Sequence, residues 1–152
     1  MLDLKKIKDW IASYSGYDIL RSFQVDYTSN IPSNGGIFPD GLVEISRVKD
    51  IVGNITIHNQ YNFGLYYVFQ KDPGDDAGAT INADWIMDFQ LWIQEQSARG
   101  LAPVFGDDAS SEVIRAQNGV LYDADEEGTA TYMVQLSVNF IKKIRSESKW
   151  NL

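Results

Sequence analysis

The segment from Ile55 to Gln70 constrains the fold more than any other feature of the sequence, because its large apolar residues recur with a period of two. They occupy the odd-numbered positions Ile57, Tyr61, Phe63, Leu65, Tyr67 and Phe69. Successive side chains of a β-strand point to opposite faces of the sheet, so this period indicates a strand with one buried face. We expect one long strand, or two strands interrupted near residues 59–62 or at Gly64, where a β-bulge is natural.

A second alternating segment lies near the end of the chain. Its apolar positions are Tyr132, Val134, Leu136, Val138 and Phe140, and the alternation continues to about Ile144. The preceding segment "SEVIRAQNGVLYDAD" is also typical of a strand. We therefore expect residues 112–143 to form a β-hairpin around the acidic sequence "DADEEG" at residues 123–128.

This acidic sequence also has the spacing that opens an EF-hand calcium loop, with Asp123, Asp125, Glu127 and Gly128 at the right offsets. The twelfth position, which should be a bidentate Glu, is Val134, and the flanking segments are strands instead of helices. A solvated turn is the favoured interpretation, because Asp and Gly suit turn geometry, and a calcium site is the alternative.

Two segments have the spacing of helices. Residues 2–14 place Leu4, Ile7, Ile11 and Tyr14 on one face, which predicts an amphipathic helix there. Residues 82–98 form the better helix, with Asn82 as its N-cap, Asp84 in its first turn and Gly100 just after its end.

The second helix has more apolar surface than one sheet can cover. One broad face carries Trp85, Ile86, Phe89, Trp92 and Ile93, while Met87 and Leu91 form a second stripe one turn apart. A helix that lies on a sheet needs one apolar face only. The second stripe is covered either by another subunit or by a loop of the same chain, and the sequence leaves both alternatives open.

Two segments rich in Gly, Pro and polar residues are interpreted as long loops, at residues 29–41 and 72–80. Loops of this kind suit ordering against a partner. The candidate interface therefore combines the second helical stripe with the acidic residues near the second loop: Met87, Leu91, Asp72, Asp75 and Asp76.

The expected element order is α-β-β-β-α-β-β, with the first strand over residues 23–28 and another over residues 42–50. Such an order predicts an α+β fold, in which a mostly antiparallel sheet carries the two main helices on one face. We expect residues 1–152 to form a single domain, with residues 145–152 as a loose C-terminal tail.

Composition excludes several function classes. The net charge of −8 disfavours sequence-specific nucleic-acid binding, which needs clustered Lys and Arg. No apolar run approaches the ~20 residues that span a bilayer, and the opening "MLDLKKIKDW" lacks the apolar block of a signal peptide. We therefore expect no membrane partner and a chain that stays in the cell that makes it.

Known catalytic and metal-binding motifs are absent from the sequence. There is no Cys, His58 is the only His, and neither a P-loop nor a Gly-x-Ser-x-Gly motif occurs. The acidic pairs Asp75–Asp76 and Asp107–Asp108 lie in polar Gly-rich stretches, where solvated turns are the usual explanation. We expect no enzyme activity, no cofactor and no required metal.

A different class of function depends on the aromatic residues. A curved sheet and an aromatic helix could enclose an apolar pocket for a small ligand, lined by Tyr61, Phe63, Tyr67, Trp85 and Trp92. Packing of the same residues in a hydrophobic core is the alternative, and it needs no ligand.

The order and texture of the segments resemble a known protein family. An N-terminal helix, "FQVDYTS", "YNFGLYYVFQKD", "DWIMDFQLWIQEQ" and a closing "YMVQLSVNFIKKI" resemble the small tail-terminator or tail-completion proteins of long-tailed bacteriophages and prophages. The resemblance covers nearly the whole chain but includes no invariant motif, and the family has no catalytic residues to carry over. The stretch at residues 29–41 departs from the family and leaves the role within the particle open.

The resemblance implies a non-enzymatic protein that forms a ring, often a hexamer. Such a ring caps the tail tube and joins it to the head connector or to a neighbouring tail part. The protein would be found in the cytoplasm of the bacterial host during assembly and in the virion tail afterwards. An acidic chain suits a tube that passes DNA, because negative charge repels phosphate.

Overall fold

The computed structural model describes residues 3–14, 22–25, 34–70, 76–124 and 129–146. The elements follow the expected order: α1 (Asp3–Ala12), β1 (Ser22–Val25), β2 (Asn34–Lys49), β3 (Ile55–Gln70), α2 (Asp76–Ala98), a 3₁₀ turn η2 (Ala109–Ser111), β4 (Val113–Ala124) and β5 (Thr129–Ile144). The hairpin over residues 112–143 is confirmed, because β4 pairs with β5 in antiparallel register.

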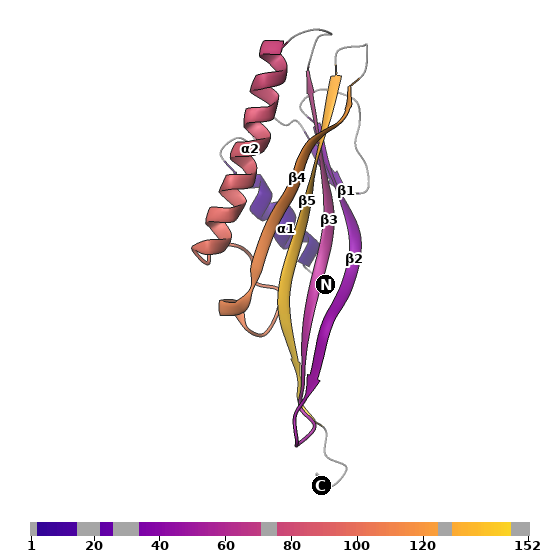
Figure 1. The fold of residues 1–152 in the computed structure, drawn as a ribbon, viewed down its shortest axis with the longest axis vertical. Helices are drawn as coiled ribbons and strands as arrows, with labels where there is room; N and C mark the ends of the chain where they lie inside the picture. The colour runs from indigo at the N-terminus through magenta and orange to yellow at the C-terminus, as the bar shows by residue number, and fades with distance from the viewer. Residues whose placement is uncertain (1–2, 15–21, 26–33, 71–75, 125–128, 147–152) are drawn as a thin grey trace.

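The five strands form one sheet in the order β1-β2-β3-β5-β4. The short strand β1 runs parallel to β2, and the four long strands are antiparallel to their neighbours. Both helices pack on one face of this sheet (Figure 1). The predicted α+β class is therefore confirmed.

The strand β3 runs without interruption through the centre of the sheet. Its register with β5 is continuous from Ile55 opposite Ile144 to Gln70 opposite Thr129. The expected alternative of a break within residues 55–70 is wrong. The irregularities lie in β2 instead, between Pro39 and Leu42 and again near Ser46. A central strand is held on both sides, so bulges form more readily in the strand nearer the edge.

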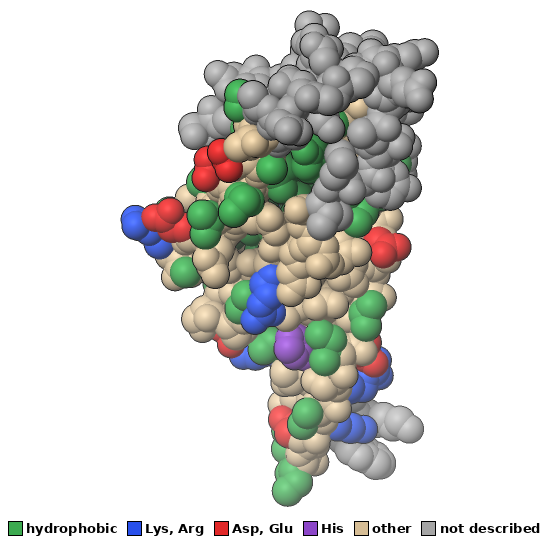
Figure 2. Space-filling model, turned by 45° about the horizontal axis from the view of Figure 1, so that its top comes forward, with side chains coloured by type: hydrophobic (Ala, Val, Ile, Leu, Met, Phe, Trp, Pro, Cys, Tyr) green, Lys and Arg blue, Asp and Glu red, His purple; other side chains and the backbone are tan. Residues whose placement is uncertain are grey.

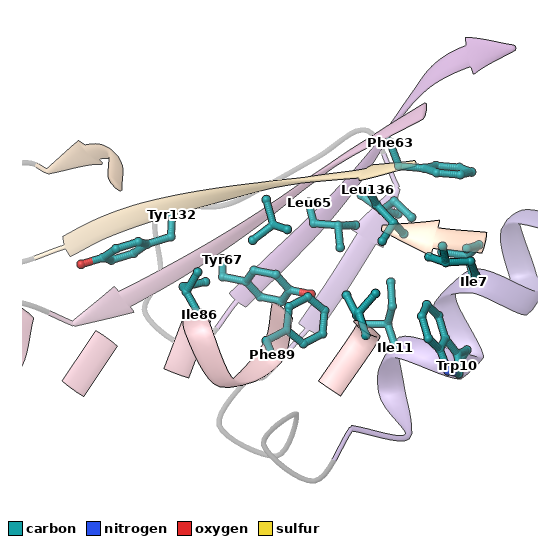
Figure 3. Packing of buried hydrophobic residues seen from close by; sticks show 14 of the residues in the cluster. Ile7, Trp10, Ile11, Phe63, Leu65, Tyr67, Ile86, Phe89, Tyr132 and Leu136 are labelled. Atoms are coloured by element: carbon teal, nitrogen blue, oxygen red, sulfur yellow. The ribbon is translucent and has the colours of Figure 1, made fainter. Parts of the chain in front are cut away.

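The hydrophobic core lies between the sheet and the two helices (Figure 3). Odd-numbered residues of β3 and even-numbered residues of β5 point toward the helices, as their period of two predicts. Helix α1 adds Ile7, Trp10 and Ile11, and helix α2 adds Ile86, Phe89 and Ile93. The helices also meet directly, since the rings of Trp10 and Trp92 stack with their centroids 5.1 Å apart.

The opposite face of the sheet is polar at Thr56, His58, Gln60 and Asn62 of β3, and carries the apolar Tyr66 and Val68 further along. Gln60 Nε2 donates a hydrogen bond of 2.9 Å to Asn139 Oδ1 across the two central strands. His58 lies on the same face and is partly exposed. This side therefore has the alternation of a sheet with one packed face and one polar face.

The prediction of a loop at residues 29–41 is wrong for its second half, because β2 already begins at Asn34. Gly35 and Gly36 pair with β1 on one side and with β3 on the other, so their backbone groups are satisfied within the sheet. Pro39 lies beyond the end of β1 and beside the first register shift, where a missing N–H is tolerated. Residues 29–33 lie outside the described residues.

The prediction of a loop at residues 72–80 is also wrong in part, because α2 begins at Asp76. Asn82 is not an N-cap but lies within the helix, where it is buried, and Asp84 is beyond the first turn. The alanines of "DDAGAT" favour a helix, and one interior Gly disfavours it by only about 1 kcal/mol.

The C-terminal end of α2 follows the prediction. Gly100 has a φ of 71°. The N–H of Leu101 donates to the carbonyl of Gln96, and the N–H of Gly100 donates to the carbonyl of Ser97. This pair of bonds is the Schellman motif, in which a glycine ends a helix because it adopts the left-handed conformation without strain.

Beyond the level of the helices, β2, β3 and the end of β5 continue as a narrow arm (Figure 1). We define the arm as residues 46–57 together with residues 142–146. It ends in the turn between β2 and β3, where Ile51 and Val52 are exposed.

Candidate interaction surface on α2 and β4

The second apolar stripe of α2 is exposed. The side chains of Met87 and Leu91 are 59% and 60% exposed, whereas Phe89 between them is fully buried. No loop within the described residues covers the stripe. The structure leaves an apolar surface on the outer side of the helix.

This stripe forms one wall of a groove between α2 and β4 with a volume of about 780 Å³. The groove also has residues of the loop before β4 in its lining. The helical side is formed by Met87, Gln90, Leu91, Gln94, Ser97 and Ala98, and the strand side by residues 113–117.

Hydrogen bonds between residues that line the groove attach α2 to the outer edge of β4. Ser97 Oγ accepts a bond of 3.0 Å from the N–H of Ile114. Gln90 Nε2 donates a bond of 3.2 Å to the carbonyl of Ala116. An edge strand usually presents such groups to solvent, so α2 satisfies an edge that other strands could otherwise join.

A glycine on β4 lets the helix approach this closely. A Cβ at Gly119 would overlap Gln90 Oε1 and lie 2.6 Å from Ile86 Cγ2. The preceding residue, Asn118, has a φ of 57°, and the register between β4 and β5 shifts at this point. The sequence reasoning missed this feature, although an Asn-Gly pair within a strand is a known indication of a bulge.

Negative charge borders the apolar stripe. Residues three apart on a helix are neighbours, so Asp84 lies beside Met87 and Asp88 lies beside Leu91. Both carboxylates are exposed. Burial raises the pKa of the Tyr14 hydroxyl, and the charge of Asp88 raises that pKa further. The outer side of α2 therefore combines apolar and acidic side chains.

The described residues that line this groove include none of the acidic members of the predicted interface. Asp72 and Asp75 lie outside the described residues. Asp76 is the first residue of α2, eleven positions before Met87, which separates the two by about 16 Å along the helix axis at 1.5 Å per residue. Of the described members of the predicted interface, the structure brings Met87 and Leu91 together and leaves Asp76 apart from them.

The acidic pair Asp107–Asp108 has a structural role. Asp107 accepts a 2.7 Å hydrogen bond from the N–H of Lys143 and donates its own N–H to the carbonyl of Ile141. A hydrogen bond from the hydroxyl of Ser110 lowers the pKa of the Asp108 carboxyl. Within the described residues, no three acidic or His side chains gather as they would around a metal ion.

The aromatic residues considered for a ligand pocket pack against one another. Phe63 and Tyr67 are buried in the core, with Tyr61, Trp85 and Trp92 around them. The ring centroids of Tyr67 and Trp85 are 4.9 Å apart. These contacts follow the core-packing interpretation.

Comparisons with known proteins add little. No protein-family model matches the chain, and no curated protein matches it. One solved structure, which carries only a sequence identifier as its name, aligns with 95% of this chain and 92% of its own at 14% identity and a TM-score of 0.39. Of the described helices, none has the length and apolar character needed to span a membrane.

Proposed function

We propose that this chain is a structural protein of a long-tailed bacteriophage or prophage and works by self-association, as a tail-terminator or tail-completion protein. One observation carries the proposal: the fold leaves Met87 and Leu91 exposed beside a groove that no described part of the chain fills. Exposed apolar surface of this kind usually marks an interface.

The energy available from the two exposed side chains is small. Burying a side chain of this size stabilises by about 1.5–3 kcal/mol, so covering the exposed part of each contributes about 1–2 kcal/mol. Two such residues do not by themselves outweigh the rotational and translational freedom that association loses, about 4–15 kcal/mol, so further contacts must contribute. The isolated chain can therefore remain a monomer at low concentration and assemble on its template.

The ring is the expected product, because oligomers of a single chain generally have closed symmetry. A ring at the end of a tail tube would join the tube to the head connector or to another tail protein. An acidic lining would help DNA to pass, since the chain has a net charge of −8. A hexamer is the size that the resemblance implies.

The decisive experiment is particle assembly. In the phage or prophage that encodes this chain, deleting the gene should give particles with irregular tail length or with unattached heads in electron microscopy. The Leu91→Asp variant should fail to restore assembly, because it places a charge in the apolar stripe. The Ile81→Asp variant is the matched control, since Ile81 is also exposed on α2 but does not line the groove.

Normal infectious particles from the gene deletion would refute the proposal. Turnover of a small molecule by the purified protein would also refute it and would favour the rival small-ligand function. Urea unfolding of both variants checks that the Leu91→Asp chain is folded. We expect each substitution to change the free energy of unfolding by no more than about 0.5 kcal/mol, because both positions are exposed.

A further inference from the structure

The turn at the end of the arm has a fixed backbone. Asp50 Oδ1 accepts hydrogen bonds from the N–H groups of Val52 at 3.0 Å and Asn54 at 2.8 Å. Gly53 has a φ of 92°, and Asn54 Oδ1 accepts a bond from the N–H of Ser146. The turn is therefore held by its own polar groups and by Ser146, which follows β5.

This fixed turn presents apolar side chains to solvent. Ile51 is fully exposed and Val52 is 67% exposed, so neither contributes to the core. Further up the arm, Val48 is 64% exposed and Ile144 is 42% exposed. Figure 2 shows hydrophobic side chains at this end of the molecule, with Lys and Arg side chains close by. A preorganised turn with exposed apolar residues has the properties of a binding anchor.

The arm and the rest of the molecule have opposite charge. Five of the six charged residues of the arm are basic, namely Arg47, Lys49, Lys142, Lys143 and Arg145, and Asp50 is the acidic one. The rest of the chain has eight basic and twenty acidic residues. The arm therefore carries a net charge of +4 and the remainder −12, so that each attracts the other part of a second copy.

The outer edge of β2 between the end of β1 and the arm is poorly suited to pairing with another strand. Two register shifts interrupt this strand, and Pro39 precedes the first of them. Exposed charges follow, with Arg47 bonded to Glu44 at 2.7 Å. Bulges, proline and charge are the features that prevent the addition of another strand at an edge. The arm is better suited to contacts through its side chains.

We propose that the tip of the arm, residues 50–53, docks in the groove between α2 and β4 of a second copy of this chain. Ile51 and Val52 contact the stripe formed by Met87 and Leu91. The basic residues of the arm lie near Asp84 and Asp88. The inference rests on the proposed self-association and names the two surfaces that meet.

The arm projects away from the groove of its own chain (Figure 1), so the contact is between copies. The two surfaces differ, which makes the contact head-to-tail. Contacts of this type form a closed ring when the rotation between neighbours divides a full turn, and a filament when it does not. Each copy then uses its arm once and its groove once.

Photochemical crosslinking tests the contact. Position 51 is replaced by a benzophenone amino acid, and the protein is irradiated at high concentration and low salt as a mixture of isotopically heavy and light chains. Crosslinks between heavy and light chains should map to residues 87–98 or 113–117. The yield of these crosslinks should decrease as the salt concentration rises from about 0.05 to 0.5 M, because salt shortens the Debye length and so weakens the attraction between the charges.

Complementary variants give a second test. Ile51→Asp and Leu91→Asp should each weaken self-association by about tenfold or more, the effect of losing one central apolar anchor. Mixed together, they should form a dimer and nothing larger, because one intact tip and one intact groove remain. The Ile81→Asp control should associate like the natural chain, as measured by native mass spectrometry and sedimentation.

The outcomes separate this inference from the proposed function. Oligomers whose crosslinks map outside the groove would overturn the docking contact and leave the assembly function standing. A lack of crosslinks between copies, or equal loss of association in the Ile81→Asp control, would also overturn it. The proposed function depends instead on the particles formed after gene deletion.

Discussion

Gly106 provides a direct test of how the loop before β4 is attached to the sheet. A Cβ at this position would overlap the carbonyl oxygen of Ile141 and lie 3.1 Å from its carbonyl carbon. The neighbouring atoms belong to the backbone of β5 and cannot rotate away as a side chain could. In the Gly106→Ala variant the loop must therefore move off the edge of β5.

The contacts that this movement breaks set the size of the effect. Asp107 bonds to the backbone of Ile141 and Lys143, and Glu112 accepts bonds from the N–H groups of Phe105 at 2.7 Å and of Gly106. Overpacking costs about 1–3 kcal/mol, and each lost hydrogen bond about 1 kcal/mol. We expect Gly106→Ala to lower the free energy of unfolding by about 2–4 kcal/mol.

Urea unfolding measures this loss, and amide hydrogen exchange identifies its cause. The N–H of Lys143 should lose protection in Gly106→Ala, because it donates to Asp107. Gly100→Ala is the matched control in the same connection: a Cβ there meets nothing within 4 Å, but its φ of 71° disfavours Ala by about 1–2 kcal/mol. A smaller loss in Gly106→Ala than in this control, or an unchanged Lys143 amide, would refute the reasoning.

Three further predictions follow from the described contacts. Ser97→Ala should lower the free energy of unfolding in urea by about 1 kcal/mol, because the N–H of Ile114 loses its acceptor, and Ser97→Thr should retain most of the stability. Desolvation raises the pKa of Asp50, but hydrogen bonds from Asn54, Val52 and Gly53 outweigh it and hold the pKa below 3.8. The bonds therefore stabilise the arm turn at pH values above the ordinary pKa and are lost as pH falls through the lowered pKa. Amide exchange of Val52 and Asn54 measured across about pH 2–5 should show this loss. Calcium or a chelator should leave the melting temperature unchanged, because the acidic hairpin turn lacks the carboxylate that closes a calcium loop; a large rise with calcium would contradict this.

The central strands could be predicted because their pattern is set by the core itself. Successive side chains of β3 and β5 point alternately toward the helices and toward the other face of the sheet. Apolar residues therefore recur in their sequences with a period of two. The second stripe of α2 was found for the same reason, since Met87 and Leu91 exceed what one face needs. Periodicity succeeds where burial alone decides residue type.

The start of β2 could not be predicted, because Gly35, Gly36 and Pro39 have poor strand propensity. They lie in a strand because β1 and β3 supply backbone partners that the local sequence does not reveal. The start of α2 was missed for a related reason: Asn82 is a good N-cap by type, yet in the structure it is a buried residue within the helix. Tertiary contacts override local preference at both places.

The arm illustrates a second limit of periodicity. Alternation identifies one face of a strand, but it does not say how far along the strand a helix covers that face. Ile57 is buried, whereas Ile144, which pairs with Ile55 on the same face of the sheet, is 42% exposed, although both are β-branched apolar residues. The difference arises because the helices do not extend to the end of the arm (Figure 1), and this depends on the packing of distant segments.

The treatment of the sheet edges supports self-association over uncontrolled aggregation. Helix α2 covers the outer edge of β4 through Ser97 and Gln90, and the loop at Asp107 covers β5 where β4 has not yet begun. Where β2 extends beyond β1, its outer edge is interrupted by bulges before the arm and carries charge. Strand addition is therefore disfavoured at each of these places. Exposed apolar side chains occur at the tip of the arm and along the groove of α2 and β4, and also at other sites such as Leu42, Ile81 and Leu101. The proposed contact pairs the first two surfaces, because they differ in shape and because the arm is basic whereas the rest of the chain is acidic.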